Sequence, residues 1–325
     1  MAMVWTALHS QLHKTLRQRA ILPRQSPVLI AVSGGQDSVC LLQLLVDLRK
    51  HWDWPLAIGH CDHGWALDQG IREHVQGLAV RFDLPCYVKV AQDLPETEAA
   101  ARQWRYQTLI EIAEEHDYNH LVTGHTQSDR AETLLYNLVR GSGSDGLQAL
   151  TWQRALTPAL QLLRPLLGIS RRQTGEFCQH LGLPVWEDAY NQSLRYARNR
   201  IRQELIPYLQ DHFNPQVEKA LAQTVEVLQA EVAYLEALAD QHYGQAYQPD
   251  PPRLERRHLQ ALPQALQRRV IRRFLQALLP HQPSFDQIEA VTALILAPNR
   301  SASPTLPGKW IIVVSGPWLL AQRPG

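Results

Sequence analysis

The sequence has few cysteines and no long apolar run, and each of these absences excludes a class of protein. Its four cysteines include no Cys-x-x-Cys pair, which argues against a disulfide framework, a zinc finger or a redox motif. No run of about 18 apolar residues is present, and the N-terminal segment has no continuous apolar stretch. We therefore expect a cytoplasmic protein that does not enter a membrane.

An excess of charge of one sign is also absent. The 32 lysines and arginines nearly balance the 31 aspartates and glutamates, so the formal net charge is +1. Such a balance gives no overall electrostatic argument for binding nucleic acid. Any case for an RNA partner depends on local clusters of basic residues.

The first half of the chain alternates short apolar runs with segments of helical periodicity. The runs at residues 28–32, 56–61, 86–90 and 121–123 predict strands, and residues 39–48, 71–80 and 98–113 predict helices. This alternation indicates an α/β fold with a mostly parallel, doubly wound sheet. Ligands of such sheets bind at the carboxyl ends of the strands.

The second half of the chain reads differently. Helical segments follow one another after Pro165, including a long one at residues 220–239, and a β-like run occupies residues 310–314. We therefore predict a catalytic domain over residues 1–205 and a smaller, mainly helical domain over residues 206–325.

A glycine-containing loop directly follows the first predicted strand and precedes a helix. Its sequence is Ser33-Gly34-Gly35-Gln36-Asp37-Ser38. Two glycines allow close approach of an anion, and a helix N-terminus directs free N–H groups at it. The pattern favours a phosphate site, and it differs from the P-loop and dinucleotide motifs.

Asp37 stands where a P-loop would have lysine. A carboxylate beside phosphates requires a cation between them, which indicates Mg²⁺. The alternative is that Asp37 only caps the helix.

The second strand ends in His60-Cys61-Asp62-His63. Two imidazoles and a carboxylate could bind a metal, but with no distant fourth ligand, contact with adenosine or a structural role is the favoured interpretation.

The fourth strand leads through Gly124 and His125 into another helix. Asp129 and Glu132 share one face of that helix by their spacing. Two carboxylates on the ligand side of the sheet favour recognition of a cationic amine or of Mg²⁺; the alternative is that they are ordinary residues near a helix N-terminus.

The loop sequence resembles the SGGxDS motif of the PP-loop ATP pyrophosphatases. Three further segments narrow the resemblance to the tRNA(Ile)-lysidine synthase family: Glu98 to Tyr106, Arg140-Gly141-Ser142-Gly143, and Arg198 to Arg202. That family often has two adjacent acids where this chain has Ser128-Asp129, which leaves the role of the first acid open.

The resemblance implies ATP-dependent joining of free L-lysine to C2 of the wobble cytidine of a tRNA(Ile) with a CAU anticodon. An adenylated cytidine is the implied intermediate, and lysidine, AMP and diphosphate are the products. ATP and Mg²⁺ are the implied cofactors, and a homodimer is a further expectation.

The predicted site follows from these motifs. The residues expected to bind ATP are Ser33, Gly34, Gly35, Gln36, Asp37, Ser38, His60, Gly124 and His125. The residues expected to act in catalysis are Asp37, Arg102, Arg105, Asp129, Glu132 and Arg140, with Asp37 holding Mg²⁺ and with Asp129 and Glu132 holding lysine.

Two local clusters of arginine supply the charge that an RNA partner requires. They comprise Arg195, Arg198, Arg200 and Arg202 in one stretch and Arg268, Arg269, Arg272 and Arg273 on one helix. We predict tRNA contacts from Arg198, Arg202 and the second cluster. A solvated amphipathic face is the alternative for that helix.

Three rival functions have weaker support. A tRNA thiolase would carry catalytic or cluster-binding cysteines, a small-molecule synthetase would not need arginine clusters, and a non-catalytic nucleotide sensor would not need Asp37, Asp129 and Glu132 together.

Overall fold

The computed structural model describes residues 5–65, 69–186 and 193–323. The chain forms two compact units, Met1–Leu228 and Gln229–Gly325, which join within the long helix α10, Val217–Ala246. The domain boundary at residues 205 and 206 stays a prediction.

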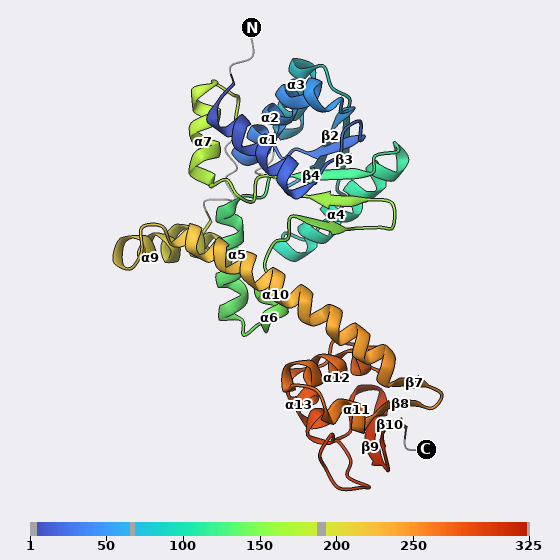
Figure 1. Cartoon of the computed structure of the whole chain (residues 1–325). Helices are drawn as coiled ribbons and strands as arrows, with labels where there is room; N and C mark the ends of the chain where they lie inside the picture. The colour runs from blue at the N-terminus through green and yellow to red at the C-terminus, as the bar shows by residue number, and fades with distance from the viewer. Residues whose placement is uncertain (1–4, 66–68, 187–192, 324–325) are drawn as a thin grey trace. The chain divides into compact units, whose positions relative to one another are not determined.

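The first unit is built on a six-stranded sheet in the order β3-β2-β1-β4-β6-β5 (Figure 1). All neighbouring strands are parallel except β5 and β6. The strands are β1 Val28–Ala31, β2 Leu56–Asp62, β3 Cys86–Val90, β4 His120–Thr123, β5 Gln153–Ala155 and β6 Gln161–Leu163. The predicted mostly parallel sheet is confirmed.

Helices connect these strands, and the predicted helices extend by a few residues at their ends. They are α1 Ala7–Arg19, α2 Gln36–Trp52, α3 Ile71–Phe82, α4 Glu98–Glu115, α5 Gln127–Val139, α6 Ser144–Leu147, α7 Arg171–His180, α8 Ala197–Arg200, the π-helix η3 Ile201–Leu205 and α9 Ile206–His212. Across the described ranges, none of the helices is both long enough and apolar enough to span a bilayer.

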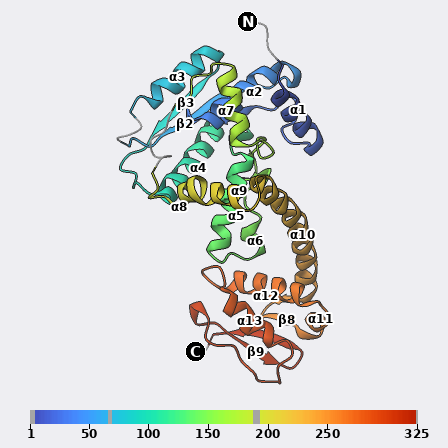
Figure 2. The same cartoon turned by 90° about the vertical axis from the view of Figure 1, so that its left-hand side faces the viewer.

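Both faces of the sheet are covered because successive side chains of a strand point to opposite faces. Val28 and Ile30 of β1 are buried in a core shared with α1, α2, α3 and α7, whereas Leu29 is buried in a second core shared with α4. Figures 1 and 2 show α7 beside α2, on the same side of the sheet as α1.

The strand order reverses between β1 and β4. From β1 the chain proceeds to β2 and β3 on one side, and it then returns to place β4 on the other side of β1. Such a reversal leaves a crevice at the carboxyl ends of the two central strands. The loops after β1 and β4 therefore meet at one place.

The second unit combines helices with a four-stranded antiparallel sheet in the order β7-β8-β10-β9. Its elements are the end of α10, β7 Tyr247–Pro249, β8 Pro252–Glu255, α11 Arg256–Gln260, α12 Gln264–Leu278, α13 Phe285–Ala293, the 3-10 turn η4 Pro307–Lys309, β9 Ile311–Ser315 and β10 Trp318–Gln322. Of these strands the sequence indicated only the region of β9.

Candidate active site

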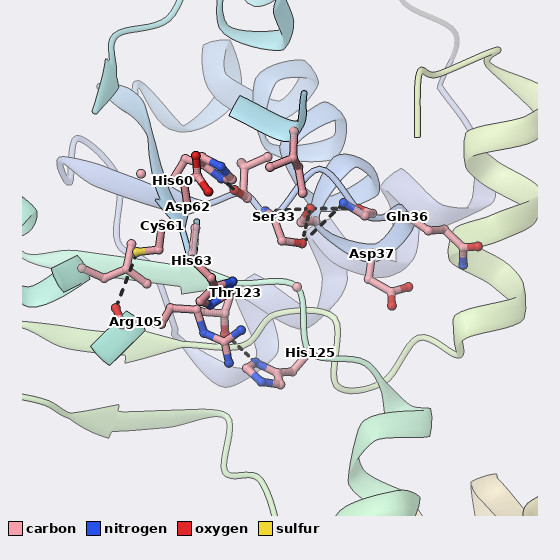
Figure 3. A pocket seen from close by; sticks show the side chains of 18 of the residues that line it. Ser33, Gln36, Asp37, His60, Cys61, Asp62, His63, Arg105, Thr123 and His125 are labelled. Carbon is pink, nitrogen blue, oxygen red and sulfur yellow. Dashed lines mark hydrogen bonds between the residues drawn. The ribbon is translucent and has the colours of Figure 1, made fainter. Parts of the chain in front are cut away.

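A cavity of about 330 Å³ lies at the carboxyl ends of the parallel strands (Figure 3). Its walls come from the loops after β1, β2 and β4, from α4, and from Arg171 and Arg202 of α7 and η3. Segments far apart in the sequence therefore meet around one space, at the edge where α/β sheets bind ligands.

The loop at residues 33–38, here called the phosphate loop, is folded tightly against the start of α2. Gly34 has φ of +81°, a left-handed conformation that strains other residues. The Ser38 hydroxyl donates to the Gly35 carbonyl at 2.8 Å and accepts from the Ser33 N–H at 3.2 Å. Since no side chain in the described ranges caps α2, its first N–H groups remain available to an anion at the loop.

Gly124 allows the loops after β1 and β4 to touch. A Cβ added at this position would lie 2.9 Å from the carbonyl carbon and oxygen of Asp37. Any side chain here would push the phosphate loop away from β4. Gly124 therefore acts through backbone packing next to the predicted ATP site.

Both oxygens of the Asp37 carboxylate have partners on α7. Arg171 Nη1 lies 2.5 Å from Oδ2, and the Thr174 hydroxyl donates to Oδ1 at 2.5 Å. Burial raises the pKa of this carboxyl above its ordinary value, although Arg171 and Thr174 act in the opposite direction. The ionised group is thus held at an energetic cost beside the phosphate loop.

Gln36 lines the cavity, but its side-chain amide bonds to α7, and its contact with ATP stays a prediction. Its amide donates to the Arg171 carbonyl at 2.7 Å and to the Thr174 hydroxyl at 2.9 Å. In Figure 3 the side chain points away from His60 and towards α7. Gln36 therefore attaches α7 to the phosphate loop.

The residues around the phosphate loop fit a magnesium ion. Mg²⁺ usually takes one or two carboxylates together with substrate phosphates. Asp37 and Asp129 both line the cavity, and the negative charge of Asp129 contributes to the raised pKa of Asp37. Within the described ranges no three or more His, Cys, Asp or Glu side chains form a ready metal cage, so phosphate oxygens would have to complete the coordination.

The second predicted cluster is a structural and aromatic wall of the cavity. The His60 ring donates from Nδ1 to the Val32 carbonyl at 2.8 Å, which ties β2 to the phosphate loop. The His63 ring stacks on Trp65, with centroids 4.9 Å apart. The His60 bond supports the loop, whereas contact of this cluster with a nucleoside stays a prediction.

Asp129 and Glu132 meet through an arginine that the sequence assigned to tRNA. Arg202 binds both oxygens of Glu132, at 2.6 and 2.9 Å, and it reaches Asp129 Oδ1 at 3.4 Å. Glu132 is buried and is not among the residues that line the cavity, whereas Asp129 and Arg202 are. Glu132 therefore positions Arg202, and Asp129 faces the ligand space.

The two carboxyls on α5 differ in their ionisation. Burial raises the pKa of Glu132. Burial also opposes ionisation of Asp129, but the interaction with His125, hydrogen bonds from Thr126 and the charge of Arg202 together outweigh burial and lower the pKa. Asp129 is therefore a stable anion that is available to a cation.

His125 lies between these groups and the arginines of α4. Its Nδ1 is 2.8 Å from the Thr123 hydroxyl. Burial lowers the pKa of His125 to about 3. The imidazole is therefore neutral near pH 7 and adds no charge to the cavity.

The three arginines predicted to act at the α-phosphate have different locations. Arg105 lines the cavity, and the Arg102 guanidinium lies 5.6 Å from the ring centre of Tyr106, which also lines it. Arg140 follows the C-terminal end of α5, where it donates to the Tyr136 hydroxyl at 2.9 Å, and it does not line the cavity. The geometry does not support a catalytic role for Arg140, which stays a prediction.

Four site residues were missed by reading the sequence: Tyr106, Arg164, Arg171 and Thr174. Ser170 and Gln173 form a capping box at the start of α7, and this pattern could have predicted the helix. Nothing local indicates that α7 returns to Asp37, since the two are separated by more than a hundred residues.

The arginines predicted to contact tRNA have acidic partners within their own units. Arg198 pairs with Glu98 at 3.2 Å. On α12, Arg268 pairs with Glu289, and Arg269, Arg272 and Arg273 converge on Glu236. Their contacts with tRNA stay predictions.

Comparison with known proteins agrees with this architecture. Residues 6–209 match the family model of the PP-loop domain, and residues 254–315 match that of the TilS substrate binding domain. A U34-tRNA thiolase from Methanococcus maripaludis shares the fold, with a TM-score of 0.58 at 16% identity over 68% of this chain and 78% of that chain.

Curated relatives match nearly the whole chain. The tRNA(Ile)-lysidine synthase of Synechocystis sp. is 56% identical over 98% of both chains, and that of Nostoc sp. is 53% identical over 99% of this chain and 98% of the relative. A chloroplastic tRNA(Ile)-lysidine synthase of Zygnema circumcarinatum is 35% identical over 90% of this chain and 80% of the relative. With both family models and these relatives in agreement, the chain belongs to the tRNA(Ile)-lysidine synthase family.

Proposed function

We propose that this protein joins L-lysine to C2 of the wobble cytidine of a CAU-anticodon tRNA(Ile), with ATP converted to AMP and diphosphate. The observation that carries the proposal is one cavity that is lined both by the phosphate loop and by Asp129 and Arg202. A nucleotide and an amine can therefore occupy the same space.

ATP would bind with its phosphates on the phosphate loop. The N–H groups at the start of α2 and the Ser33 and Ser38 hydroxyls supply donors, and Arg105 supplies positive charge across the cavity. Mg²⁺ held by Asp37 would neutralise the phosphates when bound.

The chemistry requires activation because the C2 oxygen of cytosine is a very poor leaving group. The oxygen would attack the α-phosphorus and release diphosphate, giving an adenylated cytidine. The neutral ε-amine of lysine would then attack C2, and AMP would depart with the former C2 oxygen while the amine loses a proton. Holding all reactants in one cavity lowers the entropic cost of both steps.

Lysine would be held by Asp129, whose low pKa keeps it anionic. Glu132 would act indirectly, because both of its oxygens already bind Arg202. The target base would have to leave its stack to reach the cavity. The tRNA contacts of the second unit, pairing into a homodimer and a cytoplasmic location are further parts of the proposal.

Incorporation of radiolabelled lysine tests the proposed function. Purified protein with ATP and Mg²⁺ should transfer label to a CAU-anticodon tRNA(Ile) transcript and release AMP and diphosphate, and Asp37→Ala should abolish both. Cleavage of ATP without labelling of the tRNA would reject the proposed transfer of lysine to this tRNA. Absence of both activities in the unsubstituted protein would reject the proposed ligase activity.

A further inference from the structure

A group of four arginines surrounds Tyr106 on one wall of the cavity. The Arg102 and Arg154 guanidinium carbons lie 5.6 and 5.7 Å from the ring centre of Tyr106. Arg105 precedes Tyr106 on α4 and lines the cavity with it, and Arg164 lies beside the Tyr106 hydroxyl. We call Arg102, Arg105, Arg154 and Arg164 the Tyr106 arginines.

The Tyr106 arginines have no acidic counterpart. In the part of the chain that the structure describes, none of the four forms an ion pair with a carboxylate, although most other arginines around the cavity do. The charged groups that act on Arg102 and Arg164 are other arginines and Tyr106. Four positive charges therefore gather without compensation.

The burial of Arg164 makes this excess of positive charge energetically unfavourable. The Arg164 side chain is only 2% exposed, and its Nη1 donates to the Thr151 carbonyl at 2.7 Å, whereas its Nε has no hydrogen-bond partner among the described residues. A buried guanidinium without an anion is unfavourable. Burial would raise the pKa of Tyr106, yet Arg164, Arg102 and Arg105 together lower it below its ordinary value. Both effects indicate a strong positive potential beside Tyr106.

The location of Arg154 indicates what kind of anion fits. Arg154 lies on β5, an edge strand whose three residues are all exposed, whereas Arg105 lines the cavity. The positive charge therefore extends from the cavity wall to the outer edge of the sheet. ATP phosphates already have the phosphate loop, and a small anion cannot span both places.

From this geometry we infer that Arg102 and Arg154 bind the phosphodiester backbone of the RNA beside the target base, as a subsite separate from the phosphate loop. Arg105 and the buried Arg164 add to the positive potential of this subsite. A flipped nucleotide carries its flanking phosphates to the entrance of the cavity. Arginine is suited to such contacts because its planar donors bind phosphate oxygens in pairs. The inference depends on the proposed tRNA substrate.

Arg154→Gln in the full-length protein tests this subsite, because the side chain is exposed and its removal leaves the cores intact. Binding of the CAU-anticodon tRNA(Ile) transcript is measured over a series of KCl concentrations, and KM for ATP is measured in parallel. Arg81→Gln is the matched control, since Arg81 is exposed at the end of α3, which packs against the other face of the sheet.

Arg154→Gln should weaken tRNA binding about tenfold. It should also reduce the slope of log affinity against log salt by about 0.7 to 0.9, as expected for one lost phosphate contact, with KM for ATP unchanged. Arg154→Glu should weaken binding further, because it supplies the missing carboxylate. Arg81→Gln should behave as the unsubstituted protein does.

An unchanged slope in Arg154→Gln, or an equal reduction in Arg81→Gln, would overturn the inference. A raised KM for ATP with unchanged tRNA binding would assign the arginines to the nucleotide instead. If the unsubstituted protein binds no tRNA, the proposed function itself fails, and that outcome is distinct from these.

Discussion

One arginine cluster in each unit of the molecule can be compared, and the two clusters differ in their partners. In the second unit, Arg269, Arg272 and Arg273 converge on Glu236, and Arg273 also reaches Asp240 at 2.6 Å. In the first unit, the Tyr106 arginines have no carboxylate among the described residues. Paired charges contribute to the fold, whereas unpaired charges beside a cavity remain available for a ligand.

The difference between the two clusters is not visible in the local density of arginine along the sequence. The sequence predicts tRNA contacts from four arginines close together on α12, but in the structure these arginines pair with acidic residues. The Tyr106 arginines are spread over three segments, and only the fold brings them together. Charge clusters therefore need their partners identified before they indicate a binding surface.

Removing a carboxylate from the cavity should affect activity far more than stability. Asp37→Asn should lower kcat for lysidine formation by about a thousandfold or more, because the cation beside the phosphates would lose its ligand. The pKa of Asp37 is raised in the fold, so its ionised form destabilises the folded protein above pH 3.8, and this cost disappears as pH falls.

The free energy of unfolding of Asp37→Asn at pH 7 should therefore equal or exceed that of the unsubstituted protein, as measured by urea denaturation. A marked loss of stability would show that the contacts with Arg171 and Thr174 outweigh the cost of burial.

Removing a carboxylate from the second unit should have the opposite result. Glu236→Gln leaves three arginines without their shared partner and should lower the free energy of unfolding by about 3 kcal/mol. Adenylation chemistry in the first unit should persist at permissive temperature. Glu231→Gln is the control on the same helix, where Glu231 is exposed; equal stability of the two variants would contradict the structural role of Glu236.

Asp129 should show a smaller effect on stability with a defined pH dependence. Its pKa is lowered in the fold, so the ionised group stabilises the folded protein above pH 3.8, and that contribution is lost as pH falls through the folded pKa. Asp129→Asn should therefore lower the free energy of unfolding at pH 7 by about 1.5 to 3 kcal/mol.

The stability difference between Asp129→Asn and the unsubstituted protein should shrink in acid, as measured by denaturation between neutral pH and the acid limit of folding. A difference that does not change with pH would contradict the lowered pKa.

Periodicity predicted the core of the first unit well because each element is buried in a regular way. The strand at residues 86–90 coincides with β3, and the phosphate loop lies where its sequence indicated, between β1 and α2. Strands β5 and β6, with three residues each, are too short for alternation to be recognised. The same limit hid most of the second sheet, where β7 ends and β8 begins at a proline.

The site was predictable as far as its motifs are local. Asp37, His125 and Asp129 lie in the loops or first helical turns that follow β1 and β4, and all three line the cavity. Arg202 and Glu132 could be found separately, but their bidentate pair depends on how η3 packs against α5. A single sequence contains no local pattern from which contacts between distant segments can be predicted.

The most direct test of the shared cavity separates its two half-reactions. With ATP and tRNA but no lysine, Asp129→Asn should form the adenylated tRNA at a rate close to that of the unsubstituted protein. When lysine is added, the variant should transfer it to the tRNA at least about tenfold more slowly than the unsubstituted protein does. The rate should recover partly at high lysine concentration, as expected for loss of a charge-assisted contact. Equal slowing of both steps, or normal transfer, would contradict the assignment of one wall of the cavity to ATP and the other to lysine.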